Sequence, residues 1–292
     1  MIVRVESDRI EVEAPAKLNL FLEVREKRSD GYHEIETLAV EIGLSDLLSF
    51  QQSATGSVSL VCDDPSLSCA ADNLVIKAAE RLREEVGCTA GASIALKKRI
   101  PVQAGLGGGS SDAAATLVGL NRLWSLGLSD SDLASLGAEL GSDVPFFFGG
   151  PAAICRGRGE IVTSVPFRTS FFVVLVSPGV GLSTADVYRS VRVPQQPHSV
   201  ADCENAFRSG DLDRLAKSLF NRLQPVSESL VPDLKRVRDA LLNLDPSCNG
   251  SMMSGSGSAY FGLCPDRDSA LAVAQTLEPL GVGRIRVVPC GP

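Results

Sequence analysis

Apolar and polar residues alternate along the first sixty positions in the way typical of β-strands. Residues 2–5 and 10–13 alternate apolar with charged side chains, which predicts a hairpin of two short strands. The segment LNLFLEVR, 18–25, predicts a further strand, and SDGYHEIETLAVEI, 29–42, predicts a polar turn followed by another. DLLSFQQ and SVSLVC predict two more short strands, so the chain opens on a run of strands.

The pattern changes to helical spacing at residue 72. One face of the segment 72–87 carries the apolar residues Leu74, Ala78, Leu82 and Val86. Asp72 or Asn73 can cap the start of this helix, and Gly87 can end it. SIALKKRIP, 93–101, then returns to a strand that stops at Pro101.

The rest of the chain is mainly helical, with a few strands. A helix is predicted to start near Ser110 or Ser111, and a second one to cover 128–141. Ser129 and Asp132 resemble a capping box at the start of that second helix. The further elements predicted are a strand at 171–176 and helices around 201–219, 230–243 and 268–280.

Strands first and helices afterwards predict an α+β fold in two lobes, with the break near 155–165. We therefore expect two domains, 1–160 and 161–292. The chain has 292 residues, of which 44% are hydrophobic and 22% charged, as in globular proteins.

Charge and cysteine content exclude several classes of function. The net charge of −7 gives no general affinity for nucleic acid or for an anionic membrane, so an anionic ligand needs local binding groups. The N-terminus MIVRVESDRIEVEAP lacks the apolar core of a signal peptide, and we expect a soluble cytoplasmic protein with no membrane partner. Eight cysteines without a CxxC pair, and only two histidines, argue against zinc sites and predict reduced thiols.

A glycine-rich stretch, AGLGGGSSDAA at 104–114, lies between a predicted strand and a predicted helix. Glycine amides can wrap an anion there, and the helix N-terminus adds free N–H groups, which predicts a phosphate cradle. The alternative is a glycine-rich turn with a serine helix cap. No Gly-Lys-Ser/Thr occurs, which excludes a Walker A loop, and Ser110 replaces the third glycine of a dinucleotide fingerprint.

The stretch PVQAGLGGGSSDAA resembles the central ATP motif of the GHMP kinase superfamily. Two further motifs of that superfamily are present in the right order, APAKLNLFLEV at 14–24 before this stretch and SGSGSAYFGL at 254–263 after it. The stretch APAKLNLFLEVREKRSDGYHEIETL, followed by GSDVPFF, narrows the resemblance to the 4-diphosphocytidyl-2-C-methyl-D-erythritol kinase family of the non-mevalonate isoprenoid pathway. The resemblance is loosest in 185–245. It implies an ATP-binding lobe and a smaller substrate lobe, with the active site in the cleft between them.

This resemblance also implies the reaction, which is ATP-dependent phosphorylation of the 2-hydroxyl of the cytidylyl substrate. The family's catalytic aspartate and lysine map onto Asp143 as base and Lys17 as charge stabiliser. Without the resemblance, Asp143 could be a helix cap before Val144-Pro145, and Lys17 a solvated lysine at a strand start. Mg²⁺ follows from ATP chemistry, and Ser111 is the best candidate ligand.

For the cytidylyl substrate, the resemblance assigns Tyr32 and Tyr188 as stacking faces and His33 as the partner of the base. Asn19 and Thr184 are further substrate contacts by the same mapping. The alternative for His33 is a histidine in a surface turn.

For ATP, the resemblance places Asn73 and Lys98 on the adenine side, although Asn73 can also be a helix cap. The full set of predicted ATP contacts is Asn73, Lys98, Pro101, Gly105, Leu106, Gly107, Gly108, Gly109, Ser110 and Ser111. Three rival functions remain: a GHMP kinase for homoserine or a mevalonate derivative, a kinase-fold sensor without turnover, and a dinucleotide-binding protein.

Overall fold

The computed structural model describes residues 1–6 and 9–291, and the chain divides into two compact units that alternate along the sequence. Unit 1 comprises Met1–Ala16, Leu44–Ile100 and Gly107–Gly149, and unit 2 comprises Lys17–Gly43, Pro101–Leu106 and Gly150–Pro292. Two long strands, β2 (Arg9–Lys27) and β3 (His33–Ser53), contribute residues to both units. The predicted domain boundary at residue 160 stays a prediction.

The sheet of unit 1 begins with the predicted hairpin. β1 (Ile2–Glu6) pairs antiparallel with the start of β2, from Ile2 opposite Glu13 to Glu6 opposite Arg9. β5 (Gly91–Lys97) pairs antiparallel with the end of β3 and parallel with β4 (Val58–Cys62). The predicted segments are strands, but the prediction that they are separate short strands is wrong. The pair at 10–13 and 18–25 lies in the single strand β2, and those in 29–42 and DLLSFQQ lie in β3. β5 ends at Lys97, before the predicted end at Pro101.

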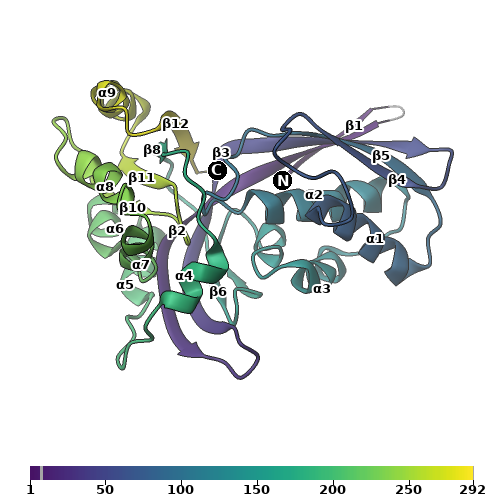
Figure 1. The fold of residues 1–292 in the computed structure, drawn as a ribbon, viewed down its shortest axis with the longest axis horizontal. Helices are drawn as coiled ribbons and strands as arrows, with labels where there is room; N and C mark the ends of the chain where they lie inside the picture. The colour runs from purple at the N-terminus through teal and green to yellow at the C-terminus, as the bar shows by residue number, and fades with distance from the viewer. Residues whose placement is uncertain (7–8, 292) are drawn as a thin grey trace. The chain divides into compact units, whose positions relative to one another are not determined.

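Three helices gather on one face of this sheet, α1 (Leu74–Val86), α2 (Gly108–Leu123) and α3 (Asp130–Leu140) (Figure 1). The residues that α1 buries are Val75, Ala78, Ala79 and Leu82, a stripe shifted slightly from the predicted face. α2 packs closely on the sheet at Gly119, where a Cβ atom would lie 2.4 Å from Phe50 Cε2. The predicted capping box of α3 is confirmed, because Ser129 and Asp132 make both of its hydrogen bonds.

Unit 2 contains a four-stranded antiparallel sheet in the order β10 (Gly250–Met253), β11 (Tyr260–Cys264), β8 (Phe171–Ser177) and β12 (Arg284–Cys290). The other strands of the unit are β6 (Ala152–Arg156), β7 (Ile161–Ser164) and β9 (Phe220–Asn221). β6 pairs with β3, and β9 pairs parallel with β2. The predicted strand at 171–176 is β8, which lies between β11 and β12 in the four-stranded sheet.

The helices of unit 2 are α4 (Thr184–Ser190), α5 (Ala201–Ser209), α6 (Leu212–Ser218), α7 (Gln224–Leu230), α8 (Leu234–Leu242) and α9 (Arg267–Leu277). The helical prediction over 201–219 is confirmed, and the segment contains two helices, α5 and α6. Gly210 ends α5 with a φ of 72°, and the Asp211 side chain caps α6. α9 packs against β8, β11 and β12, where Val174, Val176, Tyr260 and Leu277 belong to one buried core.

Within residues 1–6 and 9–291, no helix is both long and apolar enough to cross a membrane. The eight cysteines are free thiols, and four of them are buried.

Candidate active site

The loop between β5 and α2 leads into a helix whose first backbone N–H groups are not capped by any side chain that the structure describes. α2 begins at Gly108, two residues before the predicted start, and its N-cap is Gly107 with a φ of 70°. No side chain among the described residues caps this end, so the serine-cap alternative is wrong. The amides of the first turn therefore remain available to an external acceptor, as a phosphate cradle requires.

The glycines of this stretch serve different purposes. In unit 2, a Cβ atom on Gly105 would lie 2.1 Å from the carbonyl oxygen of Ser254, so packing alone requires glycine there. In unit 1, a Cβ atom on Gly109 would meet only Leu74 Cδ1, at an ordinary 3.5 Å. Close approach to a ligand thus explains the exposed Gly109 better than it explains Gly105.

Two buried polar groups lie in the first turns of α2. Ser111 and Asp112 are 0% and 3% exposed. Across the part of the chain that the structure describes, the Ser111 hydroxyl and Asp112 Oδ1 have no hydrogen-bond partner. Because buried polar groups are nearly always paired, an unpaired hydroxyl beside open amides fits a ligand oxygen or a metal ion.

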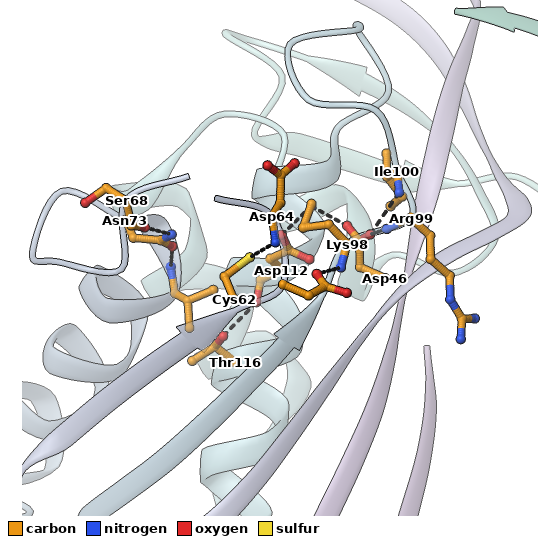
Figure 2. Close-up of polar contacts among 12 residues, drawn as sticks. Asp46, Cys62, Asp64, Ser68, Asn73, Lys98, Arg99, Ile100, Asp112 and Thr116 are labelled. Atoms are coloured by element: carbon orange, nitrogen blue, oxygen red, sulfur yellow. Dashed lines mark hydrogen bonds and ion pairs between the residues drawn. The ribbon is translucent and has the colours of Figure 1, made fainter. Parts of the chain in front are cut away.

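Beside the first turns of α2, Lys98 lies between the carboxylates of Asp46 and Asp112, as Figure 2 shows. Its Nζ donates to Asp112 Oδ2 at 2.7 Å and also to Asp46 Oδ2. Asp46 Oδ1 in turn accepts from the backbone N–H groups of Arg99 at 2.5 Å and Ile100 at 2.9 Å. These contacts join β3, the end of β5 and the start of α2.

The electrostatics of this cluster follow from its burial. The side chains of Lys98, Asp46 and Asp112 are 6%, 0% and 5% exposed. Burial raises the pKa of Asp112 to about 7; the Asp46 carboxylate acts in the same direction, and Lys98 opposes both. Burial would lower the pKa of Lys98, but the charges of Asp112 and Asp46 hold it above the ordinary value of 10.5. Lys98 stays a predicted ATP contact, although its ammonium is already paired.

Asn73 is the N-cap of α1. Its Oδ1 accepts from the Val75 amide at 2.9 Å, and its Nδ2 donates to the Ser68 carbonyl at 2.6 Å (Figure 2). The cap prediction is confirmed, and the adenine contact stays a prediction.

Asp143 belongs to unit 1 and is half-buried in the turn after α3. The short 3₁₀ helix that follows covers Pro145–Phe148, and its N-cap is Val144 without a side-chain cap bond. The interpretation of Asp143 as a helix cap is therefore wrong.

Lys17 belongs to unit 2 and lies inside β2, where it is 5% exposed. The expectation of a strand start behind Pro15 is wrong, because β2 runs through this proline, and so is the solvated-lysine alternative. Lys17 Nζ donates to Asn19 Oδ1 at 2.7 Å. The Lys17 amide also donates to the Leu106 carbonyl at 2.9 Å, which fixes β2 to the first part of the glycine-rich stretch.

The predicted substrate residues of unit 2 include an aromatic pair. The rings of His33 and Tyr188 lie 5.5 Å apart between centroids, and His33 is 9% exposed, so it is not a surface-turn histidine. Burial, and secondly the charge of Lys27, lower the pKa of His33 below 6.5. Tyr32 is 53% exposed and carries the Arg158 guanidinium over its ring at 4.9 Å.

Thr184 is exposed at the start of α4, and its hydroxyl lies 2.9 Å from Ser256 Oγ. The motif SGSGSAYFGL thus meets a predicted substrate residue within unit 2.

Comparison with known proteins covers nearly the whole chain. Residues 73–150 match the family described as GHMP kinases N terminal domain, and residues 204–279 match GHMP kinases C terminal. The 4-diphosphocytidyl-2-C-methyl-D-erythritol kinase of Synechococcus sp. is 46% identical over 294 residues, covering 94% of each chain. That of Pelotomaculum thermopropionicum is 44% identical, covering 89% of this chain and 91% of the relative. The chain belongs to the GHMP kinase family.

Solved structures agree with this membership. A crystal structure of 4-(cytidine 5'-diphospho)-2C-methyl-D-erythritol kinase matches with a TM-score of 0.80 at 37% identity, covering 97% of this chain and 99% of that chain. The homoserine kinase of Cytophaga hutchinsonii matches with a TM-score of 0.73 at 20% identity, which shows the GHMP kinase fold alone. The predicted α+β GHMP kinase fold is confirmed, and the dinucleotide-binding alternative is wrong.

Sequence reasoning missed Asp46 and Arg158. In the sequence, Asp46 looks like one polar residue of an alternating strand. The one sign of a special role is its charge, because the residues LLSF that follow it are apolar or neutral. Arg158 lies in CRGRGE, whose pattern gives no sign of the Tyr32 ring that it covers.

Proposed function

We propose that this GHMP kinase transfers the γ-phosphoryl group of ATP to the 2-hydroxyl of 4-diphosphocytidyl-2-C-methyl-D-erythritol. The observation that carries the proposal is full-length similarity, at 44% and 46% identity, to kinases named for this substrate. The open amides of α2 and the unpaired Ser111 hydroxyl support the use of a polyphosphate donor.

In the proposed reaction, Asp143 accepts the proton of the substrate hydroxyl as its oxygen attacks the γ-phosphorus. The bond from that phosphorus to the β–γ bridging oxygen breaks, and ADP leaves. Lys17 offsets the negative charge that develops and favours the ionised form of the catalytic carboxylate. Positioning and electrostatics of this kind supply most of the catalysis in phosphoryl transfer.

ATP is held, in this proposal, by the amides at the start of α2 and by the residues predicted from the glycine-rich stretch. The Ser111 hydroxyl is the group that would bind Mg²⁺ or a phosphate oxygen, because it is buried beside those amides without a partner in residues 1–6 and 9–291. Mg²⁺, when bound, neutralises charge on the phosphates.

The cytidylyl group is assigned to the aromatic residues of unit 2. His33, kept neutral at pH 7 by its lowered pKa, can both donate to and accept from the edge of a cytosine. Tyr188 orients the His33 ring, and the exposed Tyr32 ring offers a stacking face.

The direct test mixes purified protein with MgATP and the cytidylyl substrate, and measures ADP together with the phosphorylated product by ³¹P NMR. We expect one ADP for each product molecule, and no ADP when homoserine or mevalonate replaces the substrate. Turnover of homoserine or mevalonate at a higher kcat/KM would favour the rival GHMP kinase function, and ATP binding without any turnover would favour the sensor.

A further inference from the structure

A chain of four polar groups runs between β3 and β2 in unit 2. Thr37 Oγ1 donates to the Phe21 carbonyl at 2.5 Å. Asn19 Nδ2 donates to Thr37 Oγ1 at 2.8 Å, and Lys17 Nζ donates to Asn19 Oδ1 at 2.7 Å. The Thr37 hydroxyl therefore connects to the Lys17 ammonium through a single amide.

The direction of every bond in this chain is fixed by its first member. A threonine hydroxyl has one proton, and that proton is used on the Phe21 carbonyl, so only its lone pairs face Asn19. The Asn19 side chain must then present its NH₂ group to Thr37 and its oxygen to Lys17. A reversed amide would oppose donor to donor at the ammonium and acceptor to acceptor at the hydroxyl.

Burial makes this orientation matter. Thr37, Asn19 and Lys17 are 4%, 3% and 5% exposed, so water has little access to replace a lost partner. The backbone around Asn19 is held separately, because its amide donates to Ser254 Oγ at 3.3 Å and Ser254 Oγ donates to the Gly105 carbonyl at 3.0 Å. Thr37 thus controls the side-chain amide of Asn19 rather than the course of the strand.

We propose that Thr37 is a positioning residue of this kinase: its hydroxyl orients the Asn19 amide, which in turn holds the Lys17 ammonium in the place needed for phosphoryl transfer. The inference rests on the proposed role of Lys17. Thr37 needs no contact with either substrate to act in this way.

The test compares Thr37→Val, which keeps the shape and removes the hydroxyl, with Thr37→Ser, which keeps the hydroxyl. We expect Thr37→Val to lower kcat about tenfold, since the hydroxyl that orients the Asn19 amide is lost, and to leave the KM for ATP unchanged. Thr37→Ser should retain kcat within about twofold, because the same hydrogen bonds can form. Thr276→Val in α9 is the matched control, since the Thr276 hydroxyl donates to the Ala272 carbonyl within its own helix.

A double variant separates positioning from general destabilisation. If Thr37 acts through Asn19, Thr37→Val should lower kcat no further in an Asn19→Ala protein. Equal loss in Thr37→Val and Thr37→Ser, or additive loss with Asn19→Ala, would overturn the inference. Thr37→Ala asks the same question should the valine variant not fold.

Lys17→Met in the same assay distinguishes this inference from the function on which it rests. Full kcat in Lys17→Met would remove the proposed role of Lys17. Loss of turnover in Lys17→Met with wild-type kcat in Thr37→Val would leave that role intact and refute the inference about Thr37 alone.

Discussion

Two buried lysines, one in each unit, are held in contrasting ways. Lys98 of unit 1 is flanked by the carboxylates of Asp46 and Asp112, which supply formal charge. Lys17 of unit 2 donates to an amide oxygen, that of Asn19, whose NH₂ group donates in turn to the Thr37 hydroxyl. We therefore expect a division of work, in which Lys98 stabilises the fold around the glycine-rich stretch and Lys17 has the catalytic role proposed above.

The largest expected effect separates catalysis from folding. Lys17→Met and Asp143→Asn should each lower kcat by ~10²–10⁴-fold, because each removes a proposed catalytic group, the charge stabiliser or the base. Their free energies of unfolding should fall by less than that of Lys98→Met, and MgATP should still bind by calorimetry. A Lys17→Met protein that unfolds but retains kcat per folded molecule would break the comparison.

Lys98→Met should act on stability instead. It leaves two buried carboxylates without their cation, and we expect the free energy of unfolding to fall by about 3–5 kcal/mol. Urea denaturation measures this loss, with Lys77→Met on the exposed face of α1 as the control. If Lys98→Met kept wild-type stability and only raised the KM for ATP, the lysine would belong to the nucleotide site in the way the sequence predicts.

Tyr32→Ala tests the ligand assigned to unit 2. Losing one stacking face should raise the KM for the cytidylyl substrate by roughly tenfold to a hundredfold, with the KM for ATP nearly unchanged. Tyr32→Phe should be mild because the ring remains. Equal damage from both variants would assign the effect to the hydroxyl, and a raised KM for ATP would exchange the two ligand sites.

Ser111→Ala tests the ligand assigned to unit 1. We expect the KM for MgATP to rise about tenfold, the value of one hydrogen bond to a charged group, without change in the KM for the cytidylyl substrate. Unfolding should be unaffected, since the hydroxyl has no partner in the described part of the chain. An unchanged KM for MgATP together with an unchanged kcat would remove this hydroxyl from the phosphate cradle.

The smallest expected effect concerns pH. The pKa of His33 is lowered from 6.5 by burial and then by Lys27, so the neutral ring persists as pH falls from 8 to 6.5. Fewer than half of the molecules are protonated at pH 6.5, so the KM for the cytidylyl substrate should rise less than about twofold over that range, and further below it. An increase beginning near pH 7.5 would contradict the neutral-histidine assignment.

Sequence patterns predicted the local elements well where caps and periodicity agree, as in α1 and α3. They failed where pairing across the chain decides the structure: β2 continues through Pro15, and segments predicted as separate short strands are joined in β2 and β3, which are neighbours in one sheet. The motif residues were predicted from resemblance, but their surroundings were not. Burial of Lys17, or the pairing of Lys98 with Asp46 across 52 positions, depends on tertiary contacts that no local pattern contains.

The close contact between Gly105 and the Ser254 carbonyl has a practical consequence for directed evolution. A library that randomises the whole glycine-rich stretch would lose most of its members to misfolding at Gly105, whatever the ligand selected. At Gly109 an added Cβ atom meets only an ordinary contact, so variants at this position should fold and can be selected for nucleotide preference. Changes at position 105 would need compensating changes in 254–257, so those two segments are best diversified together or not at all.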